Sequence, residues 1–346
     1  MLLIIGAIVF VILFAMMGLM TLSQKKLLTP ESVLQFAKSN RNKVSLTVHQ
    51  NGKGIGAINA LQPFPLVNTS HLIIAVEYAT QAAAGKIDAT QKVNFDDIEK
   101  FHIPKLEGDQ HREWVAQMKR ARHKKDVPLQ EVVHGMLRYN SFANAEYLMY
   151  VLGIANINEC LRKLKMSKHD PIYPMASALY IADQQIDIID YRKQANAIHQ
   201  AMMETPKTQP ERATARKHST LKTWAERLPK STTKDYVSLV KKINNQNFFD
   251  KEVYHYLTPV LEDMIIVQNT KDFITHGGQF LSLTASAVNA VMYFTDKSGN
   301  RIELAVFLQN LTPQEQMKLS MSMPNFFSQI VKDPVFRKRI EMQAKD

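Results

Sequence analysis

The feature that most constrains the fold is where strand-like sequence occurs along the chain. Residues 44–60 alternate apolar and polar side chains on both sides of Asn51-Gly52, which is typical of a β-hairpin. Strand-like sequence returns only near the other end, at 286–296 and 301–311, on either side of a turn at 297–300. The natural folding solution joins the early hairpin and the late strands in one antiparallel sheet.

The sequence between these strands has mostly helical periodicity, from residue 69 to about residue 266. Gly85 and Gly153 are predicted to end two of its helices. A helix that begins at Pro30 and a final helix over 313–342 are expected to cover one face of the sheet. We therefore predict an α+β fold, with an antiparallel sheet flanked by terminal helices and an inserted all-helical subdomain.

The chain begins with a long apolar segment. Leu2 to Met20 are nineteen residues without a charge, and as a helix they would span about 29 Å, close to the thickness of a bilayer core. No basic side chain precedes the segment, and no signal-peptide cleavage site follows it. We therefore predict one N-terminal transmembrane helix that is retained as an anchor within residues 1–24. Residues 25–62 and 260–346 are then expected to form the sheet subdomain, and residues 63–259 the helical subdomain.

The chain is basic, with 43 Lys and Arg residues against 32 Asp and Glu, a net charge of +11 that favours anionic partners. The positive charge is densest in Lys119–Lys125 and Lys207–Lys230, which are interpreted either as solvated surface or as contacts to an anionic envelope polymer. Aromatic residues do not alternate with these basic residues, so nucleic acid is not an expected partner. The single cysteine, Cys160, excludes an intramolecular disulfide and a cysteine-based zinc site.

Four phrases of the sequence are specific as a set because of their order and spacing. They are FPLVNTSHLIIAVEYATQAAAGKI at 64–87, MLRYNSFANAEYLMYVLG at 136–153, HDPIYPM at 169–175 and ITHGGQF at 274–280. Together they resemble the serine β-lactamase and penicillin-binding superfamily, and above all the class A β-lactamase-related hydrolases of bacterial envelopes. The resemblance implies three motifs: Ser-x-x-Lys for the nucleophile and a nearby amine, Ser-x-Asn for proton relay, and Lys-Thr-Gly or Lys-Gly-Gly for the substrate carboxylate.

The resemblance places all three motifs on residues that depart from them. Asn68 stands at the nucleophile position and His71 at the lysine position. Asn140-Ser141-Phe142 stands where Ser-x-Asn is expected, and His276-Gly277-Gly278 where the third motif is expected. Asp170 is placed where related enzymes keep a carboxylate near the hydrolytic water. An amide nitrogen is not a nucleophile at neutral pH, so no catalytic residues are expected among these positions.

These departures predict a pseudoenzyme, a binding or scaffold component that meets a protein partner in an envelope complex. The alternative is an active serine hydrolase that acts on peptidoglycan-like or β-lactam substrates through a non-standard site. Other Ser-x-x-Lys sequences begin at Ser23, Ser219, Ser231 and Ser238, but their places in the chain do not fit the first motif. The resemblance puts the body on the extracytoplasmic side of the cytoplasmic membrane, periplasmic or outer, whereas the basic residues after the apolar segment favour the opposite orientation.

No cofactor is expected. The resemblance implies that His71 and His276 face one cleft with Asp170 nearby, and two imidazoles with a carboxylate can ligate zinc. The interpretation we favour is that both histidines are neutral replacements for lost lysines, groups with pKa values near 6.5. Four other histidines occur at no spacing typical of a zinc motif: His102, His111, His123 and His134.

Overall fold

The computed structural model describes residues 29–344 apart from 105, 107–108, 124, 205–217, 263–269, 271 and 285. The expected anchor, residues 1–24, lies outside the described residues, as does much of Lys207–Lys230. Within the described part of the chain, no helix combines the length and the apolar character needed to cross a membrane.

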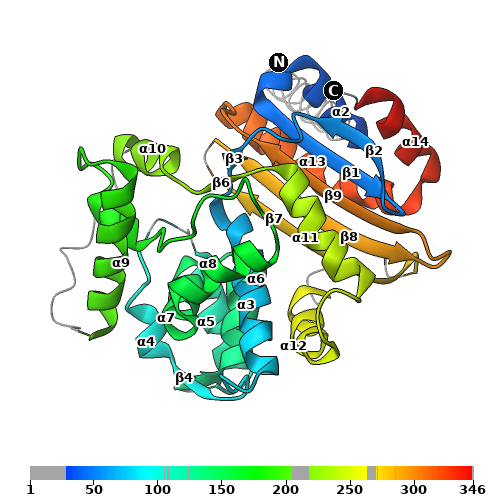
Figure 1. The fold of residues 1–346 in the computed structure, drawn as a ribbon. Helices are drawn as coiled ribbons and strands as arrows, with labels where there is room; N and C mark the ends of the chain where they lie inside the picture. Colours follow the sequence, from blue (N-terminus) through cyan, green and yellow to red (C-terminus); the bar gives the residue numbers. More distant parts are fainter. Residues whose placement is uncertain are drawn as a thin grey trace, which may run out of the picture.

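The early hairpin and the late strands share one antiparallel sheet, as predicted, in the order β2-β1-β9-β8-β7 (Figure 1). Leu46 at its centre lies opposite Ile58 on one side and Val306 on the other. The predicted turns at Asn51-Gly52 and 297–300 join β1 to β2 and β8 to β9. The strands are β1 (Val44–Gln50), β2 (Lys53–Ile58), β7 (Ile274–Leu283), β8 (Val288–Asp296) and β9 (Arg301–Leu308).

Alternation along β1 gives the sheet two different faces. Leu46 and Val48 belong to the buried cluster under the terminal helices α2 (Pro30–Ser39), α13 (Pro313–Lys332) and α14 (Pro334–Gln343). Ser45 and Thr47 point the other way, and each lies 2.8 Å from the hydroxyl of Thr233 at the start of α11 (Thr233–Asn245). Figure 1 shows α11 lying across the sheet on the side opposite α13. The sheet is therefore covered on both faces.

The last helix differs from the prediction. A single helix was expected over 313–342, but the structure has two, α13 and α14, with Asp333 between them. Pro334 is the first residue of α14 and has no N–H to donate, so the first helix ends before it. The Asp333 carboxylate accepts from the N–H of Val335 and caps the second helix.

The predicted helical block forms the other half of the molecule. Its central helices α3 and α7 are almost wholly buried, and Gly85 and Gly153 adopt positive φ just past their ends, as the sequence predicts. The turn η2 (Val67–Ser70) leads into α3. The helices are α3 (His71–Ala83), α4 (Phe95–Glu99), α5 (Gln110–Arg120), α6 (Leu129–Arg138), α7 (Phe142–Leu152), α8 (Ile154–Lys163), α9 (Ile188–Glu204), α10 (His218–Glu226) and α12 (Lys251–Glu262).

Short strands tie the block together and to the sheet. β3 (Phe64–Pro65) pairs with β6 (Lys230–Ser231), and β4 (Lys92–Asn94) pairs with β5 (Asp126–Pro128). The helix α11, which falls inside the predicted helical segment 63–259, packs on the sheet through Tyr236, whose ring lies 5.4 Å from that of Phe307. In space, α11 therefore belongs with the sheet.

A buried carboxyl lies between the sheet and α11. Glu303 of β9 is 1% exposed, and its Oε1 accepts a 2.7 Å hydrogen bond from Nδ2 of Asn244. Burial raises the pKa of Glu303 above its ordinary value of 4.5. The folded chain therefore holds this proton more tightly than the unfolded chain does.

We expect Glu303→Gln to be more stable than the wild type at pH 7, by about 1 kcal/mol, because it removes a buried charge and keeps the bond to Asn244. The wild type should lose stability as pH rises from 4.5 through the higher folded pKa of Glu303, and the variant should not. Melting temperatures between pH 4 and 8 measure the difference, with the exposed Glu341→Gln as control. Parallel pH profiles for wild type and Glu303→Gln would contradict the prediction.

Candidate functional site

Asn68, at the nucleophile position, lies in the turn before α3 and is 4% exposed. Its backbone N–H donates to Oγ of Ser282 on β7, at 3.0 Å. Its side-chain Nδ2 donates to the carbonyl of Asn140, at 2.9 Å. Ser70, not Asn68, is the N-cap residue of α3. The Asn68 side chain thus serves as a bridge between segments and not as a helix cap.

The second segment meets the same point. Asn140 has a left-handed backbone, φ 53°, and its Nδ2 donates to the carbonyl of Leu281 on β7 at 3.1 Å. Ser141 follows as the N-cap of α7 and accepts from the N–H of Asn144. Asn68, Asn140 and the end of β7 therefore form one hydrogen-bonded junction, which brings together the first and second motif positions as the resemblance implies.

The third motif position lies elsewhere on the strand. Leu281 and Ser282 of β7 reach Asn68 and Asn140, whereas His276 is six residues away, about 20 Å along an extended strand. Nδ1 of His276 lies 3.2 Å from Oε1 of Glu262 at the end of α12. His276 is therefore held at the opposite end of β7 from the junction.

The two glycines after His276 have a packing role. A Cβ atom on Gly277 would lie 2.7 Å from Cβ of Phe294, and one on Gly278 would lie 2.7 Å from the ring of Tyr293. Real Cβ atoms do not approach other atoms so closely. The packing of β7 against β8 therefore requires glycine at both positions on β7. The spacing that resembles a carboxylate-binding motif is explained by close packing against β8.

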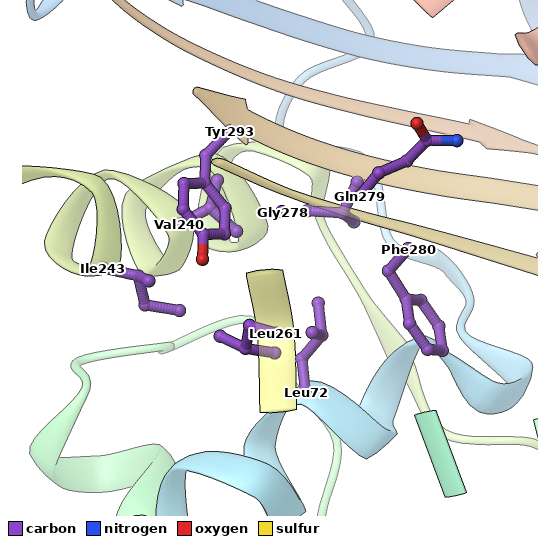
Figure 2. Close-up of a pocket in the computed structure, with 9 residues that line it drawn as sticks. Leu72, Val240, Ile243, Leu261, Gly278, Gln279, Phe280 and Tyr293 are labelled. Atoms are coloured by element: carbon purple, nitrogen blue, oxygen red, sulfur yellow. The ribbon is translucent and has the colours of Figure 1, made fainter. Parts of the chain in front are cut away.

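His71, at the lysine position, is fully buried between two aromatic rings. Its ring centroid lies 5.9 Å from that of Phe142 and 6.5 Å from that of Phe280, both in edge-on geometry. Figure 2 shows Phe280 pointing from β7 toward the start of α3, with Gln279 on the other side of the strand. Burial lowers the pKa of His71 to about 3, against a smaller opposing effect of the Met136 backbone. The lysine position therefore carries no charge at neutral pH.

The space beside His71 and Phe280 is small and apolar. A cavity of about 10 Å³, close to the room that one water molecule needs, lies between α3, α11, α12 and β7 (Figure 2). Its walls include Leu72, Leu261, Phe280 and the ring of Tyr293. A cavity of this size and lining does not hold a substrate.

Asp170 has its polar atoms engaged by the chain around it. Its Oδ2 accepts from the N–H of Lys230 at 3.0 Å and lies 3.7 Å from a guanidinium nitrogen of Arg192. Nδ1 of the neighbouring His169 lies 2.5 Å from the carbonyl oxygen of Asp170. Burial lowers the pKa of His169 to about 4. Asp170 thus fastens its loop to β6.

Strain persists beside the nucleophile position. Val67 has φ 48°, although it is β-branched, and it is 1% exposed. Such a residue in the left-handed region costs about 1–3 kcal/mol, and strain of this kind is typical of functional sites. The turn has this strained backbone conformation even though the residue after Val67, at the nucleophile position, is Asn68.

A group of potential metal ligands lies outside the motif positions. Among the described residues, the one set of three or more such side chains within reach of a single ion is Glu99, His102 and His111. His71, His276 and Asp170 are not brought together in this way. This cluster was not predicted from the sequence, although Glu99-x-x-His102 places a carboxylate and an imidazole one turn apart. The spacing in the sequence does not show that His111 joins these two residues.

The fold is that of known β-lactamases and penicillin-binding proteins. A class A β-lactamase from Bacteroides cellulosilyticus is 14% identical, with a TM-score of 0.54 over 87% of this chain and 98% of that one. A β-lactamase from Chitinophaga pinensis is 12% identical, with a TM-score of 0.57 over 86% and 98%. PBP-A, in an acyl-enzyme complex with penicillin G, is 11% identical, with a TM-score of 0.54 over 87% and 95%.

The sequence itself carries the family assignment. No curated protein matches the chain. The model of the beta-lactamase enzyme family matches residues 30–323, which is most of the chain and includes both the sheet and the helical block. The chain therefore belongs to the beta-lactamase enzyme family.

Proposed function

We propose that this protein is a catalytically inactive member of its family, a membrane-anchored pseudoenzyme that acts as a binding or scaffold component of a bacterial envelope complex. The observation that carries the proposal is the junction at Asn68. The backbone N–H and the side chain of this residue are both committed to neighbouring segments, Ser282 on β7 and Asn140 before α7.

Serine acyl transfer needs three groups that this junction lacks. It needs a nucleophilic oxygen, and Asn68 offers an amide. It needs a base or cation beside the nucleophile, and His71 is neutral with a pKa lowered to about 3. It needs free N–H donors for the developing oxyanion, and the N–H of Asn68 is donated to the Ser282 hydroxyl.

Burial supports the same conclusion. Most side chains in and beside the junction are 5% exposed or less, namely Asn68, His71, Phe142, Phe280 and Ser282, whereas Asn140 is half-buried. A substrate carbonyl would have to displace packed aromatic rings before it could reach residue 68. The interior has been filled where a hydrolase keeps an open cleft.

The anchoring and the location are part of the proposal. The uncharged segment Leu2–Met20 supports a membrane anchor within residues 1–24, and the family relationship favours a body on the extracytoplasmic face. The net charge of +11 supports contact with an anionic envelope polymer through Lys119–Lys125 and Lys207–Lys230. A protein partner would then meet the body outside the membrane.

One observation favours the alternative of an active hydrolase with a non-standard site. Nζ of Lys242 donates to Oγ of Ser238 at 2.8 Å, one turn apart on α11. Burial lowers the pKa of Lys242, and so does the nearby positive charge of Lys165. Serine–lysine pairs serve as nucleophile and base in some hydrolases, so Ser238 is the residue to test for this alternative.

Restoring the serine should not restore acylation. We expect Asn68→Ser, like the wild type, to form no covalent adduct with fluorescent penicillin and to leave a chromogenic cephalosporin intact, because the site stays closed and uncharged. An active class A β-lactamase labelled in parallel is the positive control. Labelling of the wild-type chain that is lost in Ser238→Ala or Ser219→Ala would overturn the pseudoenzyme proposal in favour of the alternative.

A second prediction concerns the neutral histidine. Because the folded-state pKa of His71, about 3, lies below the ordinary 6.5, the unfolded chain binds the proton more tightly and stability is lost as pH falls from 6.5 toward 3. His71→Leu should remove that part of the acid sensitivity, and the exposed His255→Leu should not. Chemical denaturation at pH 4 and pH 7 measures both. An equal loss of stability in wild type and His71→Leu would mean that residue 71 is not held neutral.

A third prediction concerns the anchor. The full chain should stay in the membrane fraction after a carbonate wash, and deletion of residues 1–24 should release the body into the soluble fraction. A soluble mature form that begins near Leu22 would show instead that the segment is cleaved.

A further inference from the structure

We propose that Glu99, His102 and His111 form a binding site for a divalent transition metal, zinc by preference. Glu99 is the last residue of α4, His102 follows three residues later, and His111 lies in the first turn of α5. The site is separate from the junction at Asn68, and it does not depend on whether that junction is catalytic.

The distances suit one small cation. Oε1 of Glu99 lies 3.0 Å from Nε2 of His111, and Oε2 lies 3.4 Å from Nδ1 of His102. One ligand atom from each residue lies within 4.8 Å of the others. Zinc bonds of about 2.0–2.1 Å in a tetrahedron put neighbouring ligand atoms about 3.3 Å apart. The cluster therefore needs only small adjustments to close around the ion.

The hydrogen bonds behind His111 fix its tautomer. Nδ2 of Asn144 donates to the Val132 carbonyl at 3.0 Å, which turns Oδ1 of Asn144 toward Ser141. The Ser141 hydroxyl donates its one proton to that oxygen at 3.0 Å. Nδ1 of His111, also 3.0 Å from the hydroxyl, must then be the donor to Ser141.

This tautomer leaves a lone pair facing a carboxylate. With the proton on Nδ1, a neutral His111 presents the lone pair of Nε2 to Oε1 of Glu99 at 3.0 Å. Two acceptors at this distance repel each other unless a positive charge lies between them. That charge is either a second proton on the ring or a metal ion, and the Ser141 bond is the kind of outer contact that orients metal-binding imidazoles.

The second imidazole favours the metal over the proton. The rings of His102 and His111 lie 4.7 Å apart, and a ring nitrogen of each approaches the Glu99 carboxylate, at 3.4 Å and 3.0 Å. A single metal ion binds both neutral rings and the carboxylate at once. The Glu99 side chain is 46% exposed, whereas that of His111 is fully buried, so one side of the cluster is open to a water molecule as fourth ligand.

A metal here would brace the scaffold. It would link the end of α4 to the start of α5, and through Ser141 it would support the turn that carries Asn140. The metal-bound chain should therefore unfold at a higher temperature than the metal-free chain, because only the folded state brings the three ligands together.

The test is a calorimetric zinc titration of the full chain in detergent after treatment with a chelator. We expect one zinc per chain, a raised melting temperature, and visible absorption when cobalt(II) replaces zinc. Glu99→Gln and His102→Gln should each weaken zinc binding at least about tenfold and remove the cobalt spectrum. His276→Gln is the matched control, because it breaks a His–Glu pair of similar length, 3.2 Å, that has no third ligand among the residues that the structure describes.

Two results would overturn the proposal. One is the absence of saturable zinc binding in the folded wild type. The other is wild-type zinc affinity in both Glu99→Gln and His102→Gln, which would mean that the cluster is a hydrogen-bonded ion pair only and that zinc binds elsewhere. Melting curves without zinc establish that each variant is folded, and neither variant changes the fully buried His111.

Discussion

The hydrogen bonds around Asn68 connect the two halves of the molecule. Its backbone N–H binds β7 of the sheet, its side chain binds the turn before α7, and Asn140 in that turn binds β7 in its own right. Asn68 is 4% exposed, so a lost bond of its backbone N–H would leave a buried polar group unpaired, at about 1–3 kcal/mol. In an acyl-transfer enzyme the same backbone N–H would have to stay available to the substrate. Here it stabilises the fold.

The replacements at the other positions act in the same direction. A lysine at position 71 would place an ammonium group among Phe142, Phe280 and the core, whereas a neutral imidazole fits there at a smaller desolvation cost. Phe142 also packs on Trp224, with ring centroids 5.9 Å apart. The strain at Val67 persists because the sheet and the helical block hold the turn from both sides. The side chains at positions 71 and 142 therefore pack as part of the core.

Much of the fold could be predicted from the sequence because its signals are local. The Asn51-Gly52 hairpin, the helix ends at Gly85 and Gly153, and the shared sheet all follow from periodicity and turn residues. The final helix was predicted as one because its apolar periodicity continues across Asp333, and Pro334 outweighs that periodicity. The anchor in residues 1–24 remains a prediction.

The site was harder to predict because its contacts depend on strand register and on distant segments. Sequence phrases drew attention to His276-Gly277-Gly278, yet the β7 residues at the junction are Ser282, which bonds to Asn68, and Leu281, which bonds to Asn140. A shift by an even number of residues, such as the six from His276 to Ser282, keeps the apolar alternation of a strand, so periodicity cannot detect it. The same reason explains why Ser282 was not singled out.

The histidine cluster shows the other limit of sequence spacing. Glu99 and His102 lie one turn apart, but His111 joins them only because α5 folds back, and its tautomer is set by Ser141 and Asn144 from α7. The buried polar groups at the start of α7 therefore orient the imidazole of His111, and the adjacent Asn140 bonds to β7. If the cluster binds zinc, the ion and the Asn68 junction both stabilise the turn at Asn140. The turn at Asn140 would then be held in place by a metal on one side and by hydrogen bonds to β7 on the other.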